Sequence, residues 1–523
     1  MRGARSPWSL AAAVALAAGA LGIVPGVASA AGTTWYVDCA GGNDSNTGTS
    51  TAQPWKTLNR ANTTVFHAGD KILLKRGTQC TGTLAPQGSG TASQPINAGA
   101  YGQGAKPKIA ANGALAAVLL KDVQGWEVRD LDLSNTGAAP QATDVRFGLY
   151  VVLTDFGTGH HYVVQNVDVH DVNGCDCQNP HQLVPSGGIG FKAAGSTVPT
   201  TFDDISVDHD TITKADRQGI VTSSDWEKRA EYPQGRGTSF APITGLKVHD
   251  NVIKNVGGDG IAVFNSVNAL VEANVLRDFA QRSAQYSGGM YAYNSDGTVF
   301  RSNDASSVAG PLPAQPYYFE TANNGTVFEY NYSQNNSGGA MGMCNDVGVT
   351  AKNNVFRYNI SQNDNGTGAY PWGDKIGVVT LLCGAVTDMS VYGNTFYSTT
   401  AERLVANAGS PALKFTDNIF VGRAAGSAID DPSGLYDHNV YYHVTTVPAN
   451  DAHALVLDPM LLGPGSASSR GTAAGYRLLA GSPALSAGVP VANNGGRDYF
   501  SFPIPDKPSI GAYAGPTGVR TFQ

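Results

Sequence analysis

The amino-acid sequence predicts an all-β solenoid, a single-stranded parallel β-helix in which each coil of the chain stacks on the previous one. Three observations support this fold class. An asparagine-centred motif recurs through the middle of the chain, its closest copies lie about 21 to 29 residues apart, and apolar residues alternate with a period of two rather than 3.6. A β-sandwich, the alternative, would need hairpin turns about every 8 to 12 residues and would not explain a repeated asparagine.

The recurring motif has an apolar residue, any residue, one or two polar residues, Asn or Asp, and then two residues of which at least one is usually apolar. Its copies occupy 164–167, 207–212, 248–253, 271–276, 328–332, 351–356, 391–396 and 415–420. Asparagine tolerates left-handed backbone geometry, which suits a tight turn between two strands. Because stacked asparagines can hydrogen-bond along the axis, we expect an amide ladder that satisfies buried polar groups.

A second motif, one or two glycines followed by a short apolar strand, occurs between copies of the first. It covers 188–191, 219–222, 260–264 and 289–293. Each coil is therefore expected to hold three strands of about three to five residues. Alternation points the following side chains inward: Ile189, Phe191, Ile220, Thr222, Ile261, Val263 and Met290.

The charge content is low. Charged residues make up 14% of the 523 residues, 34 basic and 41 acidic, against about 25% in an average soluble protein. This balance argues against a basic nucleic-acid-binding protein, a coiled coil and a highly charged disordered chain. The chain also has 64 glycines, 22 tyrosines and 18 phenylalanines, so we expect many turns and many packed aromatic rings.

The first 30 residues have the pattern of an export signal. Arg2 and Arg5 precede an apolar stretch at 10–27, and 28–30 form a small-residue cleavage site. A membrane anchor is the alternative, but the apolar stretch is short and no stop-transfer charges follow it. No later stretch approaches the about 20 apolar residues that span a bilayer. We therefore expect a secreted, extracellular protein without a membrane partner.

Six cysteines fit an oxidising compartment, because an even number permits disulfide bonds. Cys39 with Cys80, and Cys344 with Cys383, would each close a loop of about 40 residues. In the chain-entropy account such a loop stabilises a fold by on the order of 4 kcal/mol.

Two further cysteines lie close together in the sequence. Cys175 and Cys177 flank a single residue, and a bridge between them would be strained. A zinc site formed by Cys175, Cys177 and His181 is the alternative, although no second Cys-x-x-Cys pair supports it.

The two ends of the chain have the character of caps. Open strand edges at the ends of a solenoid would recruit other chains unless they were covered. We expect residues 31–110 to form an amino-terminal cap with the first coils, including a short helix over 54–65. Residues 111–447 would form the β-helix core, and 448–523 an irregular closing segment.

With these features the sequence resembles the right-handed parallel β-helix proteins of the pectate-lyase-like superfamily. The resemblance rests on the asparagine turns, the Gly-Asp-Gly-Ile strand start at 258–261, the entry segments 35–38, 41–49 and 53–58, and the closing segments 455–459 and 478–484. It covers nearly all of the chain after residue 30. It does not single out an activity, because this superfamily includes lyases, hydrolases, epimerases and adhesins.

In that superfamily the strand after the glycines belongs to the sheet that floors the ligand cleft, and the flanking turns carry the walls. Combined with alternation, the resemblance predicts a stripe of polar, ionisable and aromatic residues that faces outward. The stripe comprises Lys192, Ser223, Asp225, Trp226, Phe264, Asn265, Tyr291, Tyr293, Asp296, Glu320, Asn345 and Asp346. Because aromatic rings stack on sugar faces while carboxylates and amides bind hydroxyls, the stripe favours a polysaccharide substrate.

Three segments are too long for tight turns: 174–186, 225–241 and 363–374. Loops of this length inside a compact domain are usually functional or disordered. We expect the first two to form walls of the cleft. The first holds a possible disulfide bond, and the second holds Trp226, Lys228, Arg229 and Arg236.

The spacing of coils bounds the mechanism. Adjacent coils stack about 4.8 Å apart. Asp296 and Glu320 would then stand about 5 Å apart, near the separation in retaining glycosidases. Asp225 and Asp296 would stand about 9 to 10 Å apart, near the upper limit for inverting ones. Since neighbouring acids raise one another's pKa, one remains protonated as a general acid. We therefore predict glycoside hydrolysis by Asp296 and Glu320, with Asp225 or Asp346 as the alternate partner.

Two other functions fit the same stripe. A polysaccharide lyase would use Lys192 as the base, with Asp225, Asp296 and Asp346 holding Ca²⁺ against the uronate carboxylate. A non-catalytic polysaccharide-binding protein would use only the outward aromatic rings. We expect a monomer in each case, and a cofactor only where the lyase uses Ca²⁺.

Other motifs carry less functional weight. The glycine-rich 257–260 lacks the partners of a phosphate-binding loop and predicts a tight turn. His209 and His249 take corresponding positions beside the asparagine turn without metal-ligand spacing, which predicts a structural or surface role. The run 223–225 has no identified histidine partner, so a serine hydrolase is not expected.

Overall fold

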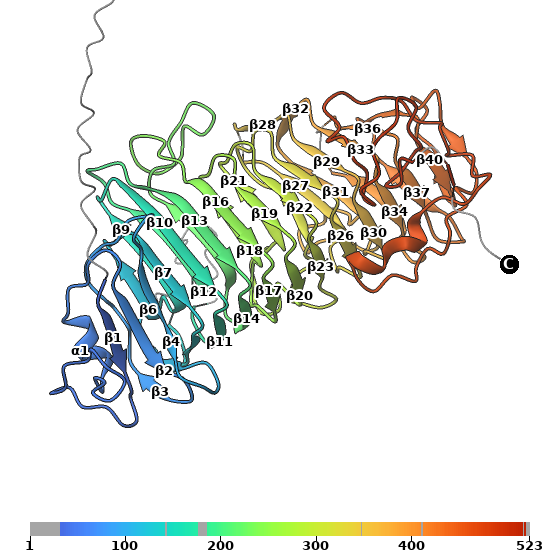
Figure 1. The fold of residues 1–523 in the computed structure, drawn as a ribbon. Coiled ribbons are helices and arrows are strands. Elements are labelled where there is room, and N and C mark those ends of the chain that lie inside the picture. Colours follow the sequence, from blue (N-terminus) through green and yellow to red (C-terminus); the bar gives the residue numbers. More distant parts are fainter. Residues whose placement is uncertain are drawn as a thin grey trace, which may run out of the picture. The chain divides into compact units, whose positions relative to one another are not determined.

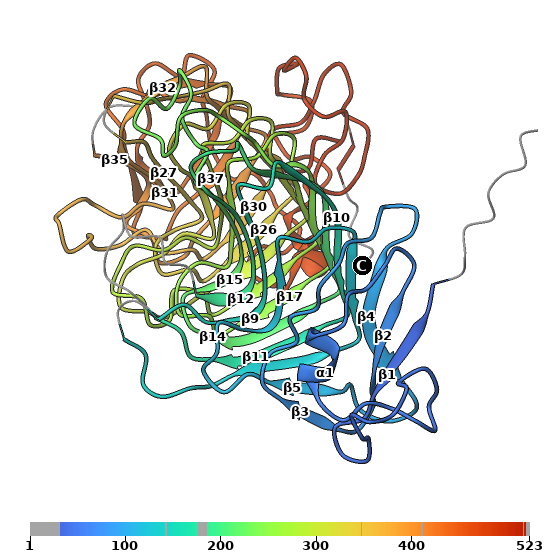
Figure 2. The ribbon, with the colours of Figure 1, turned by 90° about the vertical axis from the view of Figure 1, so that its left-hand side faces the viewer.

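The computed structural model describes residues 32–141, 144–175, 186–346, 348–408, 412–515 and 517–518. Within these residues the strands form three long parallel sheets, and the chain visits each sheet in turn as it winds (Figures 1 and 2). The predicted β-helix is confirmed. The predicted export signal, Cys177 and His181 lie outside the described residues.

The strands of each sheet follow one another coil by coil. The first sheet contains β1 Thr34–Val37, β2 Lys71–Lys75, β4 Ile96–Tyr101, β7 Trp126–Arg129, β10 Thr158–Gln165, β13 Thr201–Asp208, β16 Thr244–His249, β19 Leu270–Glu272, β22 Val299–Arg301, β25 Val327–Glu329, β29 Val355–Arg357, β33 Ser390–Tyr392, β36 Lys414–Thr416 and β39 Leu435–Asp437. The second sheet contains β3 Gln79–Thr81, β5 Lys108–Ala110, β8 Asp132–Asn135, β11 Asp168–Val172, β14 Thr211–Ala215, β17 Val252–Lys254, β20 Val275–Arg277, β23 Asp304–Ser306, β26 Tyr332–Gln334, β30 Ile360–Gln362, β34 Thr395–Tyr397, β37 Ile419–Val421, β40 Val440–Tyr442 and β42 Leu455–Val456. The third sheet contains β6 Ala116–Lys121, β9 Phe147–Thr154, β12 Gly187–Ala194, β15 Gln218–Ser224, β18 Ile261–Phe264, β21 Met290–Tyr293, β24 Tyr317–Phe319, β27 Met341–Cys344, β31 Val379–Cys383, β35 Arg403–Asn407, β38 Ser427–Asp430 and β41 Val444–Thr446. A short pair outside them is formed by β28 Thr350–Lys352 and β32 Ala385–Thr387.

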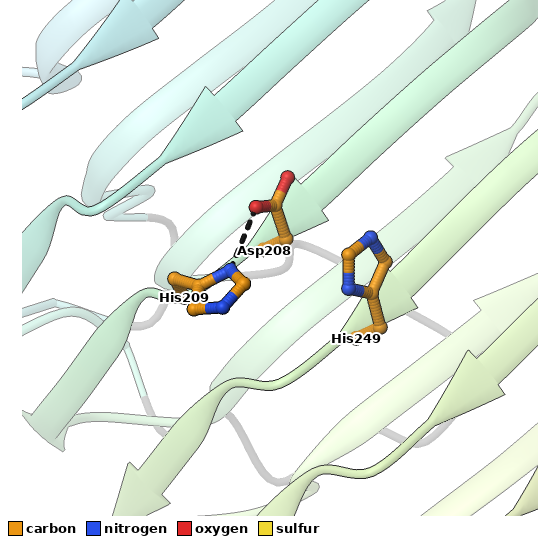
Figure 3. A group of neighbouring side chains, drawn as sticks. All are labelled: Asp208, His209 and His249. Atoms are coloured by element: carbon orange, nitrogen blue, oxygen red, sulfur yellow. Dashed lines mark hydrogen bonds and ion pairs between the residues drawn. The ribbon is translucent and has the colours of Figure 1, made fainter.

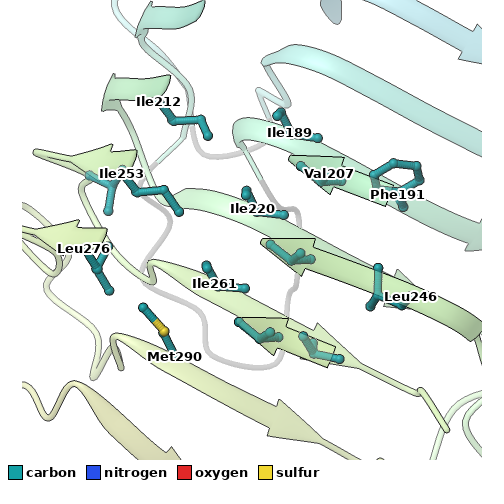
Figure 4. Packing of buried hydrophobic residues seen from close by; sticks show 14 of the residues in the cluster. Ile189, Phe191, Val207, Ile212, Ile220, Leu246, Ile253, Ile261, Leu276 and Met290 are labelled. Atoms are coloured by element: carbon teal, nitrogen blue, oxygen red, sulfur yellow. The ribbon is translucent and has the colours of Figure 1, made fainter. Parts of the chain in front are cut away.

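The core lies between the sheets and consists of vertical stacks of apolar side chains (Figure 4). On the third sheet, Ile189 pairs with Ile220, Ile220 with Ile261, and Ile261 with Met290, and all four are at most 2% exposed. These side chains point inward, as alternation predicts. Each stack continues the burial of the coil before it, so no coil is stable without its neighbours.

Close packing of the coils explains the glycine that begins several strands of the third sheet. A Cβ added to Gly219 would lie 2.5 Å from the carbonyl oxygen of Gly260, and one added to Gly260 would lie 2.5 Å from that of Gly289. Real Cβ atoms do not approach backbone oxygen so closely. The glycine motif is therefore a requirement of stacking at this corner.

The predicted amide ladder is confirmed at the corner between the first and second sheets. Each side-chain amide donates from Nδ2 to Oδ1 of the next asparagine at 3.0 to 3.1 Å. The ladder consists of Asn251, Asn274, Asn303, Asn331, Asn359, Asn394, Asn418 and Asn439, and Asp451 ends it. The motif at 351–356 lies elsewhere, because Asn354 bonds to Asn323 and Thr326 at a different corner while Asn359 takes the ladder position.

Both ends of the solenoid are covered. At the start, helix α1, Leu58–Asn62, buries Leu58 and Ala61 in the core, within the segment predicted to be helical.

The Cys39–Cys80 and Cys344–Cys383 disulfide bonds are present as predicted.

The closing segment packs against the outer face of the second sheet. It contains a 3₁₀ helix, η1 Arg470–Tyr476, and its Tyr476 and Ile510 join a cluster with Tyr332 and Ile419 of the sheet. No helix in the described part of the chain is long and apolar enough to cross a bilayer.

Candidate active site

The outward face of the third sheet carries two rows of side chains. In the first row, register places Val221, Ala262, Tyr291 and Tyr318 side by side on successive strands. Two residues later along the strands, the second row begins with Lys192 opposite Ser223 and continues with Phe264 opposite Tyr293. Glu320 follows the pair Ala292–Phe319 and so takes the next place in this row.

Lys192 lies at the start of the second row within a network of charges. Its Nζ forms a short ion pair with Asp225, and Arg236 donates to the same carboxylate at 3.2 Å. Burial lowers the pKa of Lys192, and the positive charge of Arg236 lowers it further while Asp225 opposes the change. Arg236 also binds Glu227 at 2.7 Å within the 225–241 loop, and the pair of Lys192 with Asp225 ties the start of this loop to the sheet.

An aromatic patch follows along the row. The rings of Phe264 and Tyr293 are stacked with centroids 4.9 Å apart, and Tyr232 packs edge-on against Tyr293 at 5.6 Å. The hydroxyls of Tyr232 and Tyr293 share a short hydrogen bond, and Tyr293 Oη also donates to Asp346 Oδ2 at 3.4 Å. The aromatic patch therefore lies next to the carboxylate of Asp346.

Glu320 is the most perturbed acid on this face. Together with Asp259, Tyr286, Gly288, Tyr291 and Tyr318 it lines a small cavity of about 40 Å³. Burial raises the pKa of Glu320 to about 8; the hydrogen bonds from Thr321 oppose the shift, and the charges of Asp346 and Asp259 add to it. The residue keeps partial exposure, so at neutral pH Glu320 holds a protonated carboxyl at the outward face of the third sheet.

Thr321 links Glu320 to Asp346 on the next coil. Its Oγ1 donates to Glu320 Oε1 at 3.1 Å and accepts from the backbone N–H of Asp346 at 3.0 Å. Asp346 itself is exposed. The chain thus brings a protonated acid and a solvent-facing carboxylate together at one point of the groove.

Asp259 is a site residue that the sequence reasoning missed. It is 2% exposed and accepts from the N–H of Gly288 at 3.0 Å and from Nε2 of Gln218 at 3.2 Å, and a guanidinium nitrogen of Arg217 lies 3.7 Å away. The available signal was its position directly before the strand-starting Gly260. The motif at 257–260 is a turn, as predicted. It also places the carboxylate of Asp259 at the small cavity that Glu320 lines.

Further aromatic residues border the cavity. Tyr286 and Tyr370 each form a short hydrogen bond with Gln315, and the rings of Tyr370 and Trp372 are stacked with centroids 4.8 Å apart. Trp372 is 51% exposed. It belongs to the long segment 363–374, which therefore places an exposed aromatic ring near Tyr286 at the cavity.

Several predicted binding residues are buried in the fold. Trp226 is 1% exposed, and Asn265 is fully buried with its amide donating to the carbonyls of Trp226 and Ala241. Asn345 is 3% exposed and donates to Ala385. Their side chains shape the turns and are not presented to solvent, in contrast to the predicted outward placement.

Asp296 lies differently from its predicted place. It pairs with Asn324, four positions after Glu320, so the two acids are not opposite one another on adjacent coils. Oδ2 of Asp296 binds Arg229 at 2.7 Å, and the same guanidinium holds Asn294 and the carbonyl of Ala322. Asp296 therefore anchors the 225–241 loop through Arg229, and Asp225 anchors its start to β12 through Lys192.

The acids proposed for Ca²⁺ do not converge. In the described residues, Asp225, Asp296 and Asp346 do not form a group of three close ligand atoms. Asp225 and Asp296 instead pair with Lys192 and Arg229. Lys192 and Arg229 therefore supply positive charge at the acids that were expected to hold Ca²⁺.

Comparisons with known proteins agree with this fold. Residues 211–383 match the family described as the right-handed beta helix region. The chain is a right-handed parallel β-helix. It is 25% identical to lacto-N-biosidase of Bifidobacterium longum subsp. longum over 92% of its own length, but it spans only about a third, 36%, of that relative.

Solved structures show the same architecture. The GH136 lacto-N-biosidase from Eubacterium ramulus is 24% identical, with a TM-score of 0.60 over 74% of this chain and 67% of that one. XylC in complex with xylose is 11% identical, with a TM-score of 0.55 over 93% of this chain and 99% of that one.

Proposed function

We propose that the chain is a secreted glycoside hydrolase that binds a carbohydrate polymer in the groove on the third sheet. The observation that carries this proposal is Glu320, a carboxyl protonated at neutral pH beside the exposed carboxylate of Asp346. Such a pair is the minimal equipment for breaking a glycosidic bond. The likeness to lacto-N-biosidase of B. longum supports the same class of reaction.

In this mechanism Glu320 is the general acid. Its proton passes to the glycosidic oxygen as the C–O bond breaks, and the leaving group departs as an alcohol. Asp346 faces the positive charge that develops at the sugar ring, a water molecule supplies the hydroxyl that bonds to the anomeric carbon, and one of the two carboxylates accepts the remaining proton of that water. Phe319 pairs with Met343, so Asp346 lies two positions beyond the place opposite Glu320, and the stereochemical outcome is decided by analysis of the first product. Asp259 is a positioning residue, because it is buried and its charge helps to keep Glu320 protonated.

The aromatic residues supply binding. The rings of Tyr293 and Trp372 offer exposed faces suited to stacking against sugar units, whereas Phe264, predicted to face the substrate, is 3% exposed and instead stacks on Tyr293. Asp225 and Asp296 hold the wall loop by ion pairs, so we assign them structural roles in the groove. Secretion is supported by the confirmed disulfide bonds and the sequence of the first 30 residues.

The test combines a substrate panel with three variants. The secreted protein is assayed against polysaccharides, a chromogenic lacto-N-bioside and a chromogenic xyloside, with mass analysis of products. Glu320→Gln and Asp346→Asn should each lower kcat on unactivated substrates by about 10² to 10⁴. Asp259→Asn should move the alkaline limb of the pH–rate profile to lower pH. Full activity in both Glu320→Gln and Asp346→Asn would overturn the assignment.

The same assay separates the alternatives. A lyase product carries a conjugated double bond and absorbs in the ultraviolet, whereas a hydrolase product does not. Polysaccharide binding without any release of product would indicate the non-catalytic function. Proton NMR of the first product then reports retention or inversion.

A further inference from the structure

A cluster of two histidines and one aspartate lies outside the groove, at the corner where the first sheet ends. Asp208 is the last residue of β13, His249 is the last residue of β16, and the two are paired in register. His209 follows Asp208 in a left-handed turn with φ of 57°. Figure 3 shows the three side chains gathered at this corner, with His209 on one side of Asp208 and His249 on the other.

The ligand atoms of this cluster are close to one another. One nitrogen from each ring and one carboxylate oxygen all lie within 4.8 Å, and Nδ1 of His209 is 2.9 Å from Oδ2 of Asp208. The two rings are nearly perpendicular, at 85°, with centroids 6.2 Å apart. Perpendicular rings allow two nitrogen lone pairs to point at a common centre.

The carboxylate is held in place from behind. Asp208 is 4% exposed, Gln165 Nε2 donates to its Oδ2 at 2.7 Å, and Ser206 Oγ donates to its Oδ1 at 3.1 Å. Second-layer hydrogen bonds of this kind orient the ligands in metal sites. Asp250, 2.9 Å from Nδ1 of His249, adds a second negative group beside the cluster.

The histidines are open to solvent while the aspartate is not. The side chain of His209 is 60% exposed and that of His249 is 29% exposed. A hydrated ion can therefore reach both rings, and water can complete its coordination. The rest of the corner is rigid, because Asp210 and Asn251 join the two coils through the backbone N–H of Asp210.

A second group, Asp437, His438 and His453, differs in the geometry that matters. Its rings are stacked, 4.0 Å apart at 25°, and both Nδ1 atoms approach the same oxygen of Asp437 at 2.8 and 2.9 Å. Both rings here direct Nδ1 at one carboxylate oxygen, whereas at the first corner Nδ1 of His209 contacts Asp208 and Nδ1 of His249 contacts Asp250. That group is a hydrogen-bonded clasp between the last coils and the closing segment.

We propose that Asp208, His209 and His249 bind a divalent transition-metal ion, with Zn²⁺ as the natural occupant. Imidazole and carboxylate ligands suit zinc, nickel and copper, whereas Ca²⁺ and Mg²⁺ prefer sites made of oxygen alone. Three protein ligands leave a fourth position for water. The site joins two adjacent coils on a sheet that takes no part in the proposed catalysis.

Calorimetric titration of the chelator-treated full chain with Zn²⁺ tests the site. The native protein should bind one ion at neutral pH, and His209→Asn and His249→Asn should each weaken binding by at least about tenfold. Gln165→Ala should weaken it less, because it removes only the support of Asp208. Absence of zinc binding to the native protein at millimolar Zn²⁺ would overturn the proposal.

Two controls locate the ion. His160→Asn changes an exposed histidine on the neighbouring strand β10, which pairs with Asp203, and should leave affinity unchanged. Loss of binding in His453→Asn but not in His249→Asn would place the ion at the second group and contradict the proposal. Each variant is first compared with the native protein by melting in chelator, so that a folding defect is recognised separately.

Discussion

At the scale of single residues, the raised pKa of Glu320 suits its proposed role as an acid and also affects the stability of the fold. Its carboxyl sits among tyrosine rings and near two other acids, and burial keeps its proton bound to a pKa of about 8. A general acid needs this property, but a protein has no reason to prefer it on grounds of stability. Acids whose pKa is raised in the fold weaken that fold when they ionise.

This cost predicts a pH-dependent gain in stability from Glu320→Gln. Between the ordinary value of 4.5 and about 8 the folded state holds the proton more tightly than the unfolded state, so the free energy of unfolding falls as pH rises. The uncharged amide avoids this loss. We expect the variant to exceed the native protein by about 1 to 3 kcal/mol above pH 8, the larger values being reduced because the group is partly exposed.

Denaturant unfolding across the pH range measures this difference. The gain should shrink toward zero near the ordinary pKa of a glutamate. A difference that stays constant with pH would show that the substitution acts through packing and not through ionisation. Asp506→Asn, at an exposed position, is the matched control.

At the scale of elements, the amide ladder determines how coils stack. Asn331 accepts from the N–H and Nδ2 of Asn303, and it donates to Phe300 and Asn359. Removing it leaves several buried polar groups without a partner. We expect Asn331→Ala to lower the free energy of unfolding by about 3 kcal/mol or more.

Chemical unfolding of Asn331→Ala beside Thr399→Ala checks the ladder. Thr399 is exposed and makes one side-chain bond, to Asn363, so its replacement should change stability by less than about 0.5 kcal/mol. Equal effects of the two substitutions would mean that the ladder does not hold the coils together.

The wall loop 225–241 is a second element with a testable role. Arg229 ties it to Asp296 and Asn294, and its guanidinium lies 4.5 Å from the ring of Phe240. Arg229→Ala should loosen the wall and lower kcat/KM on a polymer by about tenfold, while a small chromogenic substrate that needs no wall is affected less. Lys228→Ala, an exposed neighbour in the same loop, should leave both values unchanged.

At the scale of the whole molecule, sequence reasoning recovered what repeats. The period of the asparagine motif and the inward stack of Ile189, Ile220 and Ile261 were predicted, because each depends on equivalent positions in successive coils. Both long-range disulfide bonds were predicted from the even number of cysteines and the loops that they would close. Spacing along the chain is enough to derive such features.

The features that sequence reasoning missed depend on exact register and on loop conformation. Asp296 was expected beside Glu320, but the turn after β21 carries it four positions further on, to Asn324. Asp259 and Tyr286 meet Glu320 only because turns of different length converge. Likewise, His209 and His249 were expected at corresponding positions of two coils with a structural or surface role, but register places His249 opposite Asp208, with His209 beside them.

We propose that Glu320 supplies the proton when the glycosidic bond breaks. The most direct test is to compare substrates with different leaving groups in the Glu320→Gln variant. A dinitrophenyl glycoside needs no protonation to depart, whereas the natural substrate does. We predict that the variant nearly retains the native kcat/KM on the dinitrophenyl substrate, since kcat/KM reports the bond-cleaving step, and that its kcat/KM on the natural substrate falls by about 10² or more. Equal losses on both substrates, or none on either, would contradict the account.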